Sequence, residues 1–109
     1  MALEIVYFTI PGGEGPATYI ESQPPDESAN LFRWIETFAE TPPGQWTSMN
    51  AKMVRKHLWQ HNQGPHRVLY AIRVGQMVVL HAFSKVPRKR EQQEYLLAER
   101  RYESLFGHR

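Results

Sequence analysis

The chain has 109 residues, of which 41% are apolar and 12% aromatic, and its formal net charge at pH 7 is +2. These values suit one folded domain spanning 1–109 with a modest core. Cysteine is absent, which excludes disulfides and thiolate metal sites. No apolar run approaches the roughly 18 residues that a membrane span needs. No secretory signal is visible either, so we expect a cytoplasmic protein without membrane contact.

The charges are distributed unevenly along the chain. Residues 1–49 hold one cation and seven acids, whereas residues 50–90 hold nine cations and no acid. An acid-free stretch of 41 residues is typical of a surface that binds a polyanion. The alternative is that acids of the N-terminal half neutralise this stretch in the folded protein. The nine cations are Lys52, Arg55, Lys56, Arg67, Arg73, Lys85, Arg88, Lys89 and Arg90.

Three segments of the N-terminal half have a recognisable pattern. Residues 3–10 are rich in β-branched and aromatic side chains and end at a Pro-Gly-Gly sequence, which predicts a strand. Residues 16–22 give a weak helical signal with proline in the first turn. Residues 26–40 predict a helix with acids at its start and one apolar stripe, which we expect to be scaffold.

The clearest local signal is a hairpin. Residues 67–74 and 77–84 predict two strands joined by Gly75-Gln76 as a type II′ turn. This register places Tyr70 opposite His81 and Arg67 opposite Ser84. Both faces of the hairpin are largely apolar, so we expect it to lie in the centre of the sheet. Before it, residues 45–56 have no clear pattern, and a further strand is expected to begin at Leu58-Trp59.

The last predicted element is a helix over residues 87–106, with Pro87 in its first turn and Tyr95 at the start of its apolar stripe. Arg88, Lys89 and Arg90 lie at its start, where free N–H groups disfavour positive charge unless an anion binds. The order of elements predicts the α+β class: a mostly antiparallel sheet of about four strands, packed with two N-terminal helices and a C-terminal helix.

Two long segments resemble one known family. The sequence "HRVLYAIRVGQMVVLHAFSKVPRKREQQEYLLAERRYESL", residues 66–105, is similar to toxins of the RelE/ParE superfamily in their phage-derived HigB-like branch. These toxins combine Arg-Val-Leu-Tyr, a strand ending in Leu-His-Gly-Phe-x-Lys-Lys, and a basic, Glu-rich helix. The sequence "ATYIESQPPDESANLFRWIETFAE", residues 17–40, resembles their N-terminal helical hairpin. The resemblance therefore covers most of the chain and implies a RelE-like fold.

The chain departs from the family pattern at several positions. The family strand Leu-Trp-Glu-Leu-Arg reads Leu-Trp-Gln-His-Asn over residues 58–62, so Gln60 and Asn62 stand in place of a glutamate and an arginine. The glycine after the family histidine is Ala82, and the second lysine is Val86. The first two changes bear on any chemical role of those positions.

The resemblance implies a toxin that cuts messenger RNA in the ribosomal A site. The resemblance implies no metal and no other cofactor. It also implies that a cognate antitoxin neutralises the toxin, and we expect this antitoxin to be a helix-turn-helix, HigA-like protein. A related branch of the superfamily inhibits DNA gyrase without cutting any substrate. A non-catalytic toxin of that kind is therefore one alternative, and a non-toxic RNA-binding module is another.

Metal-free RNA cleavage needs a base, an acid and cations at the phosphate. Arg67 suits a phosphate clamp, unless it is a solvated residue at the hairpin end. His81 is a candidate base or acid, unless it is a structural histidine bonded to Tyr70. Lys85 is a candidate at the scissile phosphate. Tyr95 lies near the sequence position at which related toxins keep a tyrosine that helps at the scissile nucleotide. Its place in the apolar stripe also suits a core residue.

The other basic residues are expected to bind RNA phosphates, and we expect the strand end and helix start to form one concave site. We expect no metal site at His57, His61 and His66, because no carboxylate or cysteine lies among them. They are expected to extend the RNA-facing surface, with Trp59 available for base stacking. The expected phosphate-binding residues are Lys52, Arg55, Lys56, Arg73, Arg88, Lys89 and Arg90.

Overall fold

The computed structural model describes residues 2–107 and has the predicted α+β composition. In chain order its elements are β1 (Glu4–Tyr7), α1 (Pro16–Glu21), α2 (Pro25–Glu40), the 3₁₀ helix η1 (Pro43–Met49), β2 (Ala51–Arg55), β3 (Leu58–Gln63), β4 (His66–Arg73), β5 (Gln76–Ser84) and α3 (Arg88–Phe106). Prolines stand in the first turns of α1 and α2, and two acids begin α2, as the sequence predicts.

The sheet is mixed and, within residues 2–107, has five strands in the order β1-β5-β4-β3-β2. Strands β2 to β5 form an antiparallel meander, and β1 pairs in parallel with β5. The sequence predicted about four mostly antiparallel strands, and the strand that it did not predict is β2. This edge strand gave no clear alternation because its register shifts between Met53 and Arg55 and Met53 is exposed.

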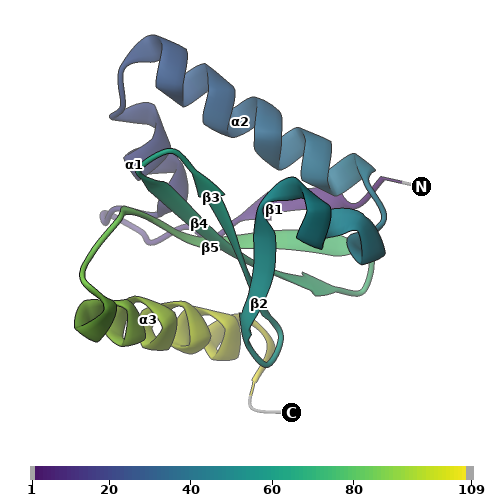
Figure 1. Cartoon of the computed structure of the whole chain (residues 1–109). Helices are drawn as coiled ribbons and strands as arrows, with labels where there is room; N and C mark the ends of the chain where they lie inside the picture. Colours follow the sequence, from purple (N-terminus) through teal and green to yellow (C-terminus); the bar gives the residue numbers. More distant parts are fainter. Residues whose placement is uncertain (1, 108–109) are drawn as a thin grey trace.

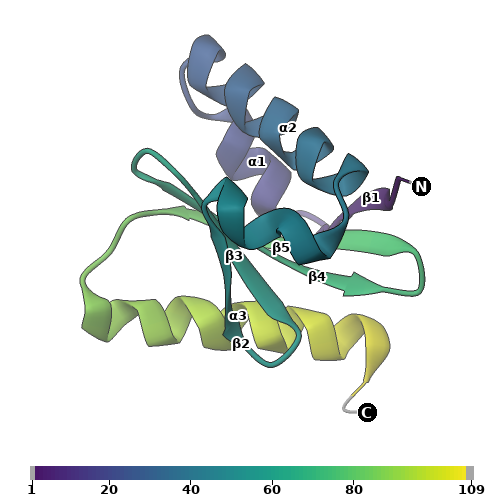
Figure 2. The ribbon, with the colours of Figure 1, turned by 45° about the vertical axis from the view of Figure 1, so that its right-hand side comes forward.

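The helices cover opposite faces of the sheet (Figures 1 and 2). Helices α1 and α2 bury one core with Val68, Tyr70 and Val79 of the central strands. Helix α3 buries a second core with the alternate residues of the same strands, including Leu69 and Leu80. The predicted central position of the β4–β5 hairpin is therefore confirmed.

The turn of this hairpin differs from the prediction by one residue. Gln76 belongs to β5 and pairs with Arg73, so the two-residue loop is Val74-Gly75. Both loop residues have positive φ, +48° for Val74 and +78° for Gly75, as in a type I′ turn. The predicted type II′ turn at Gly75-Gln76 is therefore wrong. A β-branched residue at positive φ is rare, which is why the pattern did not indicate this loop.

The register of the hairpin also differs from the prediction, because β5 contains a bulge. Leu69 pairs with His81 but Tyr70 pairs with Val79, so Leu80 is the extra residue. Because side chains alternate with period two, one extra residue moves every later side chain to the other face. His81 consequently lies on the α3 face, not opposite Tyr70.

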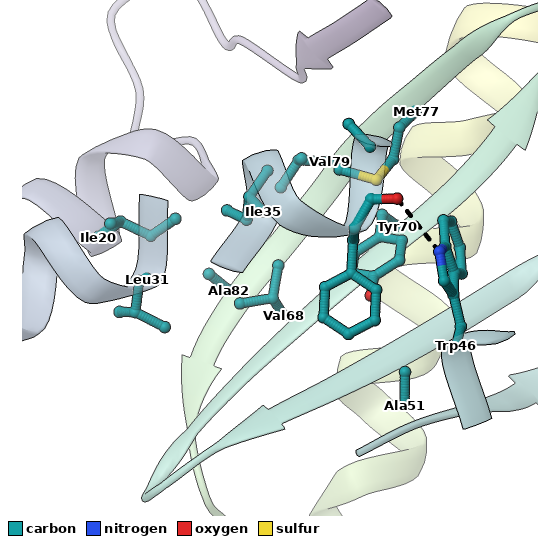
Figure 3. Packing of buried hydrophobic residues seen from close by; sticks show 12 residues of the cluster. Ile20, Leu31, Ile35, Trp46, Ala51, Val68, Tyr70, Met77, Val79 and Ala82 are labelled. Carbon is teal, nitrogen blue, oxygen red and sulfur yellow. Dashed lines mark hydrogen bonds between the residues drawn. The ribbon is translucent and has the colours of Figure 1, made fainter. Parts of the chain in front are cut away.

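Trp46 of η1 closes the first core (Figure 3). Its side chain is fully buried, and its indole N–H donates to the backbone oxygens of Phe38 at 3.1 Å and Thr41 at 3.0 Å. Its ring lies edge-on to Phe38, Trp59 and Tyr70. This tryptophan joins the end of α2 to the sheet, and it lies in a segment whose sequence had no clear pattern.

His61 is buried in the same core and does not extend an RNA-facing surface. Its ring centroid lies 4.6 Å from that of Phe38 and 5.7 Å from that of Trp34, and its Nδ1 has no hydrogen-bond partner among the described residues. Burial lowers the pKa of His61 to about 4; a side-chain hydrogen bond with Gln63 acts in the opposite direction, and Arg67 in the same direction.

We expect this histidine to make the protein acid-sensitive. The unfolded chain binds a proton at His61 near pH 6.5 but the folded chain only near pH 4, so its contribution to stability is complete above pH 6.5 and is lost as the pH falls towards 4. The loss amounts to about 3 kcal/mol. Urea unfolding at pH 7 and pH 4.5 should show a smaller pH effect for His61→Phe. An equal pH effect in both proteins would contradict this origin.

Candidate functional site

The positive charges of three arginines, each from a different element, act to lower the pKa of the Tyr95 hydroxyl in α3, against the effect of its burial. Tyr95 is buried against the sheet, with 6% of its surface exposed. The guanidinium of Arg55, in β2, lies 5.8 Å from the centre of its ring. Burial raises the pKa of the Tyr95 hydroxyl, and Glu91 adds to this, whereas Arg55, Arg67 and Arg88 act in the opposite direction. The hydroxyl thus lies in a field of three positive charges and one negative charge.

The fold explains this arrangement. Arg88, Glu91 and Tyr95 follow one another at helical spacing along one side of α3. Arg67 lies on the α3 face of β4, because it pairs with Phe83, a member of the α3 core. Arg67 and Tyr95, although distant in sequence, therefore lie on the same side of the sheet.

The three arginines differ in their partners. Arg55 is neutralised, since its Nη1 lies 3.1 Å from Glu99 Oε1 and its Nη2 donates to Gln92. Arg67 donates only to backbone oxygens, to Gly64 at 2.8 Å and His66 at 3.0 Å. A guanidinium has five N–H donors, so Arg67 retains donors for an anion. The Arg67 guanidinium is therefore the half-buried cation of this site best placed to receive a phosphate.

Two amides lie beside Arg67. Asn62 pairs directly with Arg67 across β3 and β4, and Gln60 lies two residues away on the same face. Gln60 Nε2 donates to Asn62 Oδ1 at 2.8 Å, while Gln60 Oε1 is buried without a partner among the described residues. These are the positions at which the chain departs from the resembled family pattern, so the departures lie next to the site.

His81 has partners that the sequence did not indicate. Its Nε2 lies 2.7 Å from Glu94 Oε1, and its Nδ1 lies 3.5 Å from Arg101 Nη1. Burial lowers the pKa of His81, the hydrogen bond and charge of Glu94 oppose this, and Arg101 adds to it. The alternative of a bond to Tyr70 is wrong, because Tyr70 lies on the other face and its hydroxyl has no partner within the described chain.

Helix α3 separates His81 from Arg55. Glu94 and Arg101 lie on one flank of the helix, whereas Gln92 and Glu99, which bind Arg55, lie on the other. Arg67 and His81 share a face on adjacent strands, but no contact joins their side chains. The structure thus groups Tyr95 with Arg55, Arg67 and Arg88, and it binds His81 separately to α3.

Comparison with known proteins identifies the family. The model of the family described as "Phage derived protein Gp49-like (DUF891)" matches residues 18–103. The chain belongs to this Gp49-like family. The family is in general a RelE/HigB-like, toxin-type family, and the matched region includes every residue of the Tyr95 site. The search of curated proteins found no match for the chain.

The helix start of this Gp49-like protein is as cationic as predicted. Helix α3 begins at Arg88, one residue later than expected, and Pro87 precedes it without a side-chain cap. Arg88, Lys89 and Arg90 are exposed. Lys85 is also exposed, and its backbone N–H donates to Pro65 O at 2.7 Å, which attaches the segment before α3 to the β3–β4 loop.

The remaining basic residues are dispersed. Lys52, at the start of β2, and Lys56, in the β2–β3 turn, are both exposed. Arg73 lies at the opposite end of β4 from Arg67, where it donates to the Tyr102 hydroxyl at 3.3 Å and covers the Phe106 ring at 4.6 Å. Of the nine cations in residues 50–90, only Arg55 has a carboxylate within salt-bridge distance among the described residues. The structure therefore does not support the alternative that acids of the N-terminal half neutralise the cations of residues 50–90.

The predicted histidine surface is wrong for two of its three members. His61 and His66 are buried, and Trp59 packs against Trp46. His57 is exposed and stacks on Tyr102. Within residues 2–107, no group of three or more His, Cys, Asp or Glu side chains is placed to hold a metal ion. No helix in that range is long and apolar enough to cross a membrane.

Proposed function

We propose that this Gp49-like protein is the toxin of a toxin–antitoxin pair and that it cleaves messenger RNA on the ribosome without a metal. The observation that supports this most is the grouping of Tyr95 with Arg67 and Arg88. The cations of residues 50–90, to which both arginines belong, have hardly any acidic partners in the described chain. Fixed cations near a developing negative charge are often the largest contribution to catalysis. The toxin-type family supports the same proposal.

In this mechanism Arg67 and Arg88 bind the scissile phosphate and stabilise the extra charge that forms on it. The 2′ oxygen of the ribose attacks phosphorus, and the bond to the 5′ oxygen breaks. The Tyr95 hydroxyl is protonated at neutral pH, and we assign it the role of the acid that protonates the leaving oxygen. Lys85 is a further cation at the scissile phosphate, whereas Lys89 and Arg90 bind neighbouring phosphates as point charges outside the reacting group.

His81 has a less direct part in this proposal. Both of its ring nitrogens face partners on α3, so it would have to exchange one of them before it touched RNA. We assign it to positioning α3, and with it Tyr95, over the sheet. The partners that we propose are messenger RNA on the ribosome and a helix-turn-helix antitoxin, and the site of action is the cytoplasm.

One observation favours a non-catalytic toxin, such as a gyrase inhibitor, as the second candidate. Neutral amides, Gln60 and Asn62, occupy the positions beside Arg67 at which the resembled family has charged residues. A surface that only binds has no need for charged proton-transfer groups there.

Mapping of messenger RNA 5′ ends after induction separates the two candidates. A nuclease should produce new 5′ ends within coding regions before growth stops. Growth arrest with intact transcripts would contradict the nuclease and favour the binding toxin. As a control, induction of the Arg67→Ala variant should leave transcripts intact if the arginine site cleaves them.

A further inference from the structure

Four hydrogen-bonded side chains join α1, α2, β4 and β5 at the end of the sheet opposite the Val74-Gly75 turn. The hydroxyl of Tyr19 lies 2.8 Å from His66 Nδ1 and 2.8 Å from Ser84 Oγ. His66 Nε2 lies 2.7 Å from Glu27 Oε1. The contacts therefore form an unbranched chain from Glu27 through His66 and Tyr19 to Ser84.

The partners determine the direction of the hydrogen bonds when His66 is neutral. A carboxylate only accepts, so the His66 proton is on Nε2 and is donated to Glu27. Nδ1 then accepts from the Tyr19 hydroxyl, whose oxygen accepts in turn from Ser84. Every proton in the chain points towards Glu27. A histidine held between a carboxylate and a hydroxyl group is the arrangement that activates hydroxyls in many enzymes.

The chain is buried in its middle and open at its end. The His66 side chain is 6% exposed and that of Glu27 is 50% exposed, while Ser84 is exposed at the surface. The charged groups around His66 are Glu27 from α2 and Arg67 from β4, which donates to the His66 backbone oxygen. Lys85 follows Ser84 directly, so the open end lies beside a cation with no acidic partner in the described chain.

We propose that these four residues form a proton relay that accepts the proton of an RNA ribose hydroxyl, with the adjoining phosphate bound at Lys85 and the start of α3. This rests on the proposed function. The 2′-OH takes the place of Ser84 and gives its proton to the Tyr19 oxygen, and Tyr19 gives its own proton to His66 Nδ1. Glu27 stabilises the imidazolium. The 2′ oxygen bonds to phosphorus, the bond to the 5′ oxygen breaks, and the leaving oxygen takes a proton from the general acid.

The Tyr19→Phe variant tests the relay, because it removes one hydroxyl and keeps the ring. In single-turnover cleavage of ribosome-bound messenger RNA, we expect a loss of about 100-fold or more. Tyr7→Phe is the matched control, since its hydroxyl has no hydrogen bond within residues 2–107, and it should cleave like the wild type.

Melting temperatures of both variants distinguish a relay from a clamp between helices and sheet. A clamp alone predicts that Tyr19→Phe melts at a lower temperature but cleaves at the wild-type rate. That result would overturn the relay.

Nuclear magnetic resonance of ¹⁵N-labelled histidine gives a readout that does not require cleavage. A short RNA added to the free protein should shift the ring nitrogens of His66, and DNA of the same sequence, which lacks the 2′-OH, should leave them unchanged. RNA that shifts His66 while ribosomal messenger RNA stays intact would refute ribosomal cleavage and retain the relay as an RNA site. RNA that binds without shifting His66, or no RNA binding at all, would refute the relay.

Discussion

The Arg67→Ala variant should cleave RNA about 100-fold to 1000-fold more slowly than the wild type, because it removes a fixed charge from the site of the developing phosphorane. Arg67 is the half-buried cation of the Tyr95 site that has no carboxylate partner in the structure. Single-turnover cleavage measures the effect on the chemical step. Arg67→Lys should restore only part of the rate, since an ammonium lacks the planar fork of donors that a phosphate accepts.

Arg100→Ala is the matched control for this variant. Arg100 is exposed on α3, and its side chain has no hydrogen bond or ion pair within residues 2–107. It should cleave within about twofold of the wild type, as expected for a surface substitution. Arg67 also donates to Gly64 and His66, so a modest loss of stability is expected, and cleavage must be measured well below the melting temperature. Wild-type cleavage by folded Arg67→Ala would exclude Arg67 from the chemistry.

The Trp46→Ala variant should lose about 3–5 kcal/mol of unfolding free energy, which is the usual cost of removing a large aromatic side chain from a core. Trp46 is fully buried among three aromatic rings and donates to two backbone oxygens at the end of α2. A small domain has only about 5–15 kcal/mol in total, so the variant should be close to unfolding at room temperature. Urea unfolding monitored by circular dichroism measures the loss.

One further variant separates the contributions of the ring and the N–H group, and a second serves as a surface control. Trp46→Phe keeps an aromatic ring and removes the donor, so it should lose less than Trp46→Ala. Val74→Ala removes a β-branched side chain that is 90% exposed and lies at positive φ in the hairpin loop, so it should not lower stability. A loss below 1 kcal/mol for Trp46→Ala would contradict the role of η1 as the closure of the core.

The sequence predicted those parts of the fold whose signals are local. Helices α2 and α3 were predicted within a residue of their observed starts, because proline, first-turn residues and apolar spacing coincide there. The β4–β5 hairpin was predicted from two apolar runs. Its register was not, because the bulge at Leu80 has no local signature and the loop contains a valine at positive φ.

In the candidate site, too, the features with a local sequence signal were predicted and those without one were not. The positions of Arg67 and Tyr95 followed from strand and helix patterns, and the acid-free segment indicated cations without partners. The partners of His81 depend on which face of β5 it occupies, and the bulge decides this. The contacts of His66 with Tyr19 and Glu27 join residues 47 and 39 positions apart, so no local pattern could indicate them.

Reconstituted cleavage is the most direct test of the Tyr95 site as a nuclease centre. Purified ribosomes carrying a messenger RNA with an empty A site would be mixed with the wild type and with Tyr95→Phe, in the presence of a chelator that leaves the ribosomes intact. We predict that the wild type cuts the messenger RNA at the A site and that Tyr95→Phe, which keeps the buried ring, cuts it about 100-fold more slowly. An intact messenger RNA with the wild type, or equal cleavage by both proteins, would contradict the account.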